Sequence, residues 1–184
     1  MTTTARTVLV AATIFMVSGC GWDTLAFSIG GEDDWSAPSP LVDSGGRTEF
    51  GLSLWRDEFP VNIGVSVYGG DEGSEIVTAH VQGGIGLPLL DPVEGNFTPG
   101  LALTATLGGW SWRGSPEHAG LLTGIGVMLV LGWENDAGEG TGLGFSALRN
   151  RAVMLEYGSL WLNGAVGDSD AEMRRWRISY VHQF

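Results

Sequence analysis

Hydrophobic and polar residues alternate one by one through most of this chain, and helical periodicity is almost absent. Successive side chains of a β-strand point to opposite faces, so the alternation predicts strands with one apolar and one polar face. We expect eight such strands, the last of which runs to Phe184. They lie within residues 24–29, 49–54, 61–68, 77–85, 101–108, 120–132, 153–162 and 173–184.

The seventh segment departs from strict alternation. Its first apolar residues, from Val153 to Tyr157, share one face, but Leu160 and Leu162 fall on the other. A β-bulge places one extra residue in a strand and would return both leucines to the apolar face. We therefore predict a bulge at Gly158–Ser159.

The polar faces distinguish a membrane barrel from a soluble one. A soluble sandwich or lipocalin-like barrel would carry many charged residues on its outward face. Here the polar positions hold mainly Gly, Ala, Ser, Thr, Asn and Gln, which suit the crowded interior of a narrow eight-stranded barrel. Charged residues make up only 16% of the chain, against roughly 25% in soluble domains. We expect these apolar residues to lie outside, toward lipid: Leu101, Leu103, Leu107, Val127 and Leu129.

Aromatic residues gather near the ends of the segments, as in the girdles of membrane barrels. The expected girdle residues are Phe50, Trp55, Phe59, Phe97, Trp110, Trp112, Trp133, Trp161 and Trp176. The connections alternate between two sides. The expected outer loops are 31–46, 69–74, 113–118 and 164–171, and the inner turns are 56–60, 88–96 and 134–150. Residues 141–148 could instead form an extra strand or a short helix, and an extra strand would break the even count unless residues 24–29 were not a strand.

The final segment resembles the closing strand of bacterial outer-membrane β-barrel proteins. In those proteins a C-terminal aromatic residue, preceded by alternating apolar residues, serves as the assembly signal. The matching residues here are Trp176, Ile178, Tyr180 and Phe184. With the alternation, this resemblance implies an all-β, eight-stranded antiparallel transmembrane up-and-down β-barrel in the outer membrane. Its expected partners are outer-membrane lipid and the barrel-assembly machinery, and we expect a monomer without a cofactor.

The N-terminal residues predict a secretory signal peptide, residues 1–19, ahead of a barrel domain at residues 20–184. The apolar run from Val8 to Val17 follows Arg6 and is too short for a membrane-spanning helix, which needs about 20 residues. Val17-Ser18-Gly19-Cys20 resembles a bacterial lipobox, which implies that Cys20 is acylated. The alternative is an ordinary cleavage site beside an incidental cysteine. Most barrels of this type are not lipoproteins, so the combination is a departure from the family pattern.

Charge and candidate chemistry narrow the function. A formal net charge of -12 argues against nucleic acid, which is bound through Lys and Arg. The three histidines lack metal-ligand spacing, and Ser115 and His118 lack the motif of lipid A-modifying hydrolases, so we expect no catalytic or metal site. The leading hypothesis is a non-enzymatic outer-membrane barrel with acidic outer loops, serving envelope integrity or surface interaction. The alternative is a lipid-anchored soluble periplasmic lipocalin-like barrel that binds an apolar ligand.

Four charged residues are expected inside the barrel because strand parity places them on the polar face: Glu49, Glu156, Arg175 and Arg177. Lone buried charges are costly, so these carboxylates and guanidiniums should pair and leave no aqueous pore. A hairpin loop at 164–171 would set Glu156 across from Ser179 and diagonal to Arg177. The sequence thus predicts a plugged lumen.

Overall fold

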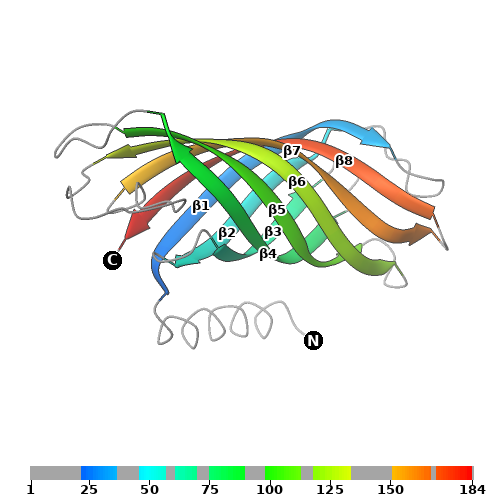
Figure 1. Ribbon diagram of the computed structural model, residues 1–184. Coiled ribbons are helices and arrows are strands. Elements are labelled where there is room, and N and C mark those ends of the chain that lie inside the picture. The colour runs from blue at the N-terminus through cyan, green and yellow to red at the C-terminus, as the bar shows by residue number, and fades with distance from the viewer. Residues whose placement is uncertain are drawn as a thin grey trace.

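The described residues form a closed antiparallel barrel in which each strand pairs with the next along the chain and β8 pairs with β1 (Figure 1). The computed structural model describes residues 22–36, 46–56, 61–69, 75–89, 98–112, 118–133, 151–166 and 169–183. The eight strands are β1 (Trp22–Ser36), β2 (Thr48–Arg56), β3 (Val61–Gly69), β4 (Glu75–Pro88), β5 (Thr98–Trp112), β6 (Ala119–Trp133), β7 (Arg151–Val166) and β8 (Ser169–Gln183). The predicted all-β, eight-stranded up-and-down barrel is confirmed.

The strands tilt steeply against the barrel axis. Following paired residues once around the barrel from Leu25 on β1 leads back to Ser36, much farther along the same strand. Tilts of about 35–45° accompany such an offset. β1 begins where β8 ends, and we call this the terminal end and the opposite one the distal end. A line of paired residues therefore climbs toward the distal end as it passes from β1 to β8.

Large apolar side chains cover the outside of the wall. Leu101, Leu103, Leu107 and Val127 are exposed, with Leu103 at 67% and Leu107 at 58%, and Leu129 is partly exposed. Their predicted outward orientation is confirmed. Nowhere in the described ranges is there a helix long and apolar enough to cross a membrane.

The interior is filled in three layers, which β8 crosses in order: Ala171 and Met173, then Arg175, Arg177 and Ser179, then Val181. The distal apolar layer consists of Tyr68, Ile76, Trp110, Trp112, Leu122, Leu160, Leu162, Ala165, Ala171 and Met173. The terminal apolar layer consists of Ala26, Ala102, Met128, Val130, Ala152, Met154 and Val181. Between them lies the central polar layer, formed around Glu49, Asn62, Ser66, Gln82, Thr104, Glu156, Arg175 and Arg177.

The predicted bulge at Gly158–Ser159 is wrong. Pairing of β7 with both neighbours runs without interruption through this point. Leu160 and Leu162 therefore do point inward, and both are buried in the distal apolar layer. The expectation failed because it assumed a uniformly polar interior, whereas the two leucines have an apolar cluster to join.

The predicted register between β7 and β8 is also wrong. The strands continue to Val166 and from Ser169, so most of the expected loop at 164–171 is strand. Val166 pairs with Ser169 but Leu162 pairs with Ala171, so β7 advances four residues while β8 advances two. Gly164, with φ of 72°, lies in this irregular stretch. The surplus shifts the later pairs, and Glu156 lies directly opposite Arg177 while Ser179 faces Met154.

Two expected girdle residues, Trp110 and Trp112, lie inside the barrel instead. They are 3% and 8% exposed and belong to the distal apolar layer. The alternation along β5 already places both residues on its inward face. The expectation was wrong because it considered only that they lie near the end of a strand. β1 also extends to Ser36, into the expected loop 31–46. Residues 1–19, Cys20, 141–148 and Phe184 lie outside the described residues.

Candidate functional site

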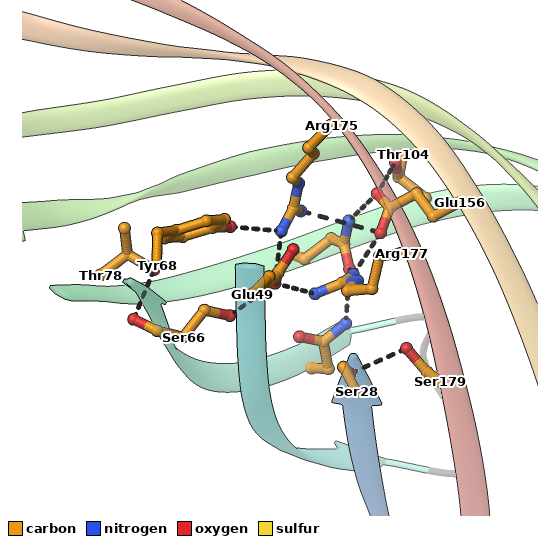
Figure 2. A network of polar contacts seen from close by, with 12 residues as sticks. Ser28, Glu49, Ser66, Tyr68, Thr78, Thr104, Glu156, Arg175, Arg177 and Ser179 are labelled. Atoms are coloured by element: carbon orange, nitrogen blue, oxygen red, sulfur yellow. Dashed lines mark hydrogen bonds and ion pairs between the residues drawn. The ribbon is translucent and has the colours of Figure 1, made fainter. Parts of the chain in front are cut away.

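The structure brings the four charged residues expected in the lumen together at the centre of the barrel (Figure 2). Glu49 extends inward from β2, Glu156 from β7, and Arg175 and Arg177 from β8. All four are at most 6% exposed. The two carboxylates and two guanidiniums balance in formal charge, which is the condition for burying them together.

Each guanidinium contacts both carboxylates. Arg175 Nη1 donates to Glu49 Oε1 at 2.8 Å, and its Nη2 lies 3.7 Å from Glu156 Oε2. Arg177 Nη2 donates to Glu156 Oε2, and its Nη1 lies 3.9 Å from Glu49 Oε1. The four groups therefore form one crossed network rather than two separate pairs.

Neutral side chains complete this network. Gln82 Nε2 and Thr104 Oγ1 donate to Glu156 Oε1 at 2.5 and 3.0 Å, and Ser66 Oγ donates to Glu49 Oε1 at 2.8 Å. Gln82 Oε1 accepts from Arg177 Nη2 at 2.9 Å, and Arg175 Nη1 donates to the Tyr68 hydroxyl at 2.7 Å. Sequence reasoning assigned some of these residues to polar faces but did not place them in the site, because their contacts join strands far apart in the sequence.

Two glycines leave room for the carboxylates. A Cβ atom at Gly30 would lie 3.2 Å from Glu49 Oε2 and 2.3 Å from the backbone oxygen of Trp176. At Gly126 it would lie 3.0 Å from both Glu156 Oε1 and Thr104 Oγ1. Larger residues at these positions would displace the network or the neighbouring strand.

A second buried ion pair lies at the distal end. Arg47, just before β2, donates from Nη1 to Glu32 Oε2 at 2.8 Å. Its guanidinium carbon lies 4.3 Å from the ring centroid of Trp35 and 5.4 Å from that of Trp112, within the range of cation–π contacts. Because Trp112 comes from β5, which is not a neighbour of β1 or β2, these contacts join β1 and β2 to β5 through the interior. Sequence reasoning missed this ion pair because Glu32 lay in the expected loop 31–46 and Arg47 fell between that loop and the next expected strand.

The described residues of the expected assembly signal lie apart from this network. Trp176, Ile178 and Tyr180 are exposed on the outer face of β8, where side chains alternate with those that point inward. In the same span, Arg175, Arg177 and Ser179 face the lumen. One segment thus serves the outer apolar surface and the central polar layer at once.

The geometry of the network is that of a structural site. Three of the four carboxylate oxygens, Glu49 Oε1 and both oxygens of Glu156, accept from guanidinium, hydroxyl or amide donors of this chain, whereas Glu49 Oε2 has no hydrogen-bond partner among the described residues. Across the described residues, no group of three or more His, Cys, Asp or Glu side chains is arranged to hold a metal ion. The network can join β2, β3, β4, β5, β7 and β8 through the lumen.

These features define the class: a closed, eight-stranded, up-and-down antiparallel β-barrel with a charged network in a filled interior. Among solved structures, the chain is similar to the crystal structure of Neisserial surface protein A (NspA), with a TM-score of 0.51 and 10% sequence identity. The match covers 88% of this chain and 97% of that one. At this identity the likeness concerns the fold. No protein-family model matches the chain, and no curated protein sequence matches it.

Proposed function

We propose that this chain is a non-enzymatic, monomeric outer-membrane β-barrel with a plugged lumen, acting in envelope integrity or surface interaction. The observation that carries this proposal is the polarity of the wall. Large apolar side chains such as Leu103 and Ile125 are exposed outside, whereas Glu49, Glu156 and their arginine partners are buried inside. A lipid-facing barrel requires this arrangement because its surroundings are apolar.

The same observation disfavours the soluble lipocalin-like alternative. A carrier of an apolar ligand needs an apolar cavity inside and a polar surface outside. In this chain the central polar layer occupies the position of such a cavity. The similarity in fold to a protein named for the cell surface agrees with the proposed location.

Membrane insertion is tested by fractionation and gel migration. An inserted barrel stays in the membrane pellet after carbonate washing and migrates differently on gels when boiled. We expect both behaviours from the full chain. Release into the periplasmic fraction when Cys20 is replaced by serine would instead support the soluble, lipid-anchored alternative.

The plugged lumen is tested by electrical recording. The three filled layers predict no large, steady single-channel conductance from the folded protein in a planar bilayer. A large, steady conductance would contradict the plug. Porin-type barrels of 16–18 strands, which leave an aqueous channel, provide the positive control for the recording.

The proposed targeting features are tested by two substitutions. Acylation of Cys20 predicts that labelled fatty acid is incorporated into the natural chain and not into Cys20→Ser. The proposed assembly signal predicts that Phe184→Ser sharply reduces the heat-modifiable form in the outer membrane. An undiminished amount of this form would count against the signal.

A further inference from the structure

A groove runs up the outer wall across β5, β6, β7 and β8. Its sides are formed by apolar residues, and its distal end reaches the hydroxyl of Ser159 and the guanidinium of Arg174. The residues that define it are Leu103, Ile125, Val127, Tyr157, Ser159 and Arg174. A second hollow with almost purely apolar lining shares Val127 and Tyr157 with it and continues toward Leu155 and Ile178.

The register explains the groove. One row of paired, outward-facing residues reads Leu103, Val127, Tyr157 and Trp176, and the next reads Ala105, Ile125, Ser159 and Arg174. The second row contains two short side chains beside the long ones of the first, so the surface is lower there. Because paired rows climb toward the distal end from β5 to β8, the groove rises out of the apolar wall and ends at Arg174.

Charges of both signs surround the distal end of the groove. Arg174 is half exposed, and its nitrogens lie 3.8 Å from Asp34 Oδ2 and 3.5 Å from Glu172 Oε1. These separations are longer than ordinary hydrogen bonds, so the guanidinium can turn toward an incoming acceptor. Asp33 lies beside them, since the Tyr157 hydroxyl donates to its Oδ2 at 2.8 Å. This bond also holds the tyrosine ring along the side of the groove.

We propose that this groove binds one phospholipid with an ethanolamine headgroup. An acyl chain lies along the apolar groove, Arg174 receives the phosphate, and the ammonium binds among Asp33, Asp34 and Glu172. Charge complementarity selects this occupant. The carboxylates of Asp34 and Glu172 lie beside the Arg174 guanidinium, and that of Asp33 lies next to the Tyr157 hydroxyl, so negative charge exceeds positive charge there. A purely anionic headgroup is repelled, while a zwitterionic one matches both signs. A choline headgroup has no N–H to donate to the carboxylates and fits less well.

This inference rests on the proposed membrane location of the barrel, and mass spectrometry of the folded, detergent-solubilised protein tests it. The protein is first shown to be heat-modifiable, then mixed with equal amounts of phosphatidylethanolamine and phosphatidylglycerol, and retained lipids are counted on the intact protein. We expect one phosphatidylethanolamine to be retained in preference to phosphatidylglycerol. The Arg174→Gln variant should retain it about fivefold less, the effect of losing one exposed ion pair.

A matched pair of substitutions locates the binding. Ser159→Phe fills the groove with a ring, whereas Ala79→Phe adds the same ring to the outer face of β4, away from it. Retention should fall for the first and stay at the natural level for the second. Arg174→Gln provides the independent test of the site should Ser159→Phe not give the heat-modifiable form.

Several results would overturn the proposal. Equal retention of the two lipids would show that the carboxylates do not select the headgroup, and stronger retention of a lipid A-type glycolipid would assign the groove to another occupant. Unchanged retention in Arg174→Gln, or equal retention in the two phenylalanine variants, would place the lipid elsewhere. A chain that never becomes heat-modifiable would instead count against the proposed membrane barrel itself.

Discussion

The central polar layer and the distal apolar layer fill the same lumen by different physical means. In the polar layer, each charge has a partner at a defined position. The single carboxylate of Glu156, for example, accepts hydrogen bonds from side chains on β4, β5 and β8. In the apolar layer, side chains such as Leu122 and Met173 are buried without directional contacts. The first depends on which group lies opposite which, and the second depends on how completely a volume is filled.

Because of this difference, the apolar layers contribute mainly to stability and the polar layer mainly to the specificity of strand pairing. Buried ion pairs contribute little net stability because the charges lose their hydration, whereas apolar packing contributes in proportion to the area buried. The polar layer instead penalises the wrong register: a slip of two residues would set Glu156 against Ser179 and leave Arg177 without its opposite partner. We infer that the apolar layers hold the barrel together and the polar layer selects its strand pairing.

The largest expected effect comes from breaking the network on one side. Arg177→Leu leaves the buried carboxylate of Glu156 without its nearest cation and should lower the free energy of unfolding by about 3–5 kcal/mol. Urea unfolding of the barrel in phospholipid vesicles, followed by tryptophan fluorescence, measures this loss. The double variant Glu156→Leu with Arg177→Leu removes both charges and should recover much of it. A double variant as unstable as the single one would show that the unpaired charge is not the cause.

Truncation in the distal apolar layer should have the next largest effect. Leu122→Ala leaves a cavity in the packed interior and should cost about 2–4 kcal/mol in the same unfolding experiment. Its neighbour Leu121 is 53% exposed on the outer wall, so Leu121→Ala leaves no enclosed cavity and should cost less than about 1 kcal/mol. Equal losses for the two variants would contradict the assignment of inside and outside on β6.

The Arg47 contact combines both kinds of interaction and should have a smaller effect. Arg47→Met keeps an apolar stem over Trp35 but removes the charge, and we expect a loss of about 1–2 kcal/mol. Arg47→Lys keeps the ion pair with Glu32 but not the flat guanidinium. Its free energy of unfolding should therefore lie between that of the natural chain and that of Arg47→Met. A lysine variant as stable as the natural chain would show that the ring contacts of the guanidinium are not significant.

The smallest effect is expected at His80, a buried residue of β4 near the polar layer. Within the part of the chain that the structure describes, neither of its ring nitrogens has a hydrogen-bond partner. His80→Leu therefore removes polar atoms without breaking a hydrogen bond to another described residue, and the free energy of unfolding should change by less than about 1 kcal/mol. A loss as large as that of Arg177→Leu would make His80 a member of the network.

The sequence was sufficient to predict the features that depend on the two-residue alternation of a β-strand. Alternation predicts the eight strands, the outward side chains of β5 and β6, and the inward direction of Glu49, Glu156, Arg175 and Arg177. It does not report the depth of a residue in the lumen, so it could not reveal that Leu160 and Trp110 join an apolar layer. Nor does it report pairing between distant strands, which brings Gln82 and Thr104 to Glu156.

The surplus of two residues in β7 near Gly164 also limits how this barrel can change. A shift of the pairing register by a single residue would move every following side chain to the opposite face, which would place the buried charges on the apolar outer surface. A change of two residues preserves the two faces and moves each inward residue by one place against the neighbouring strand. A change in hairpin length by two residues can therefore give the inward side chains new partners inside the barrel while the outer surface stays apolar.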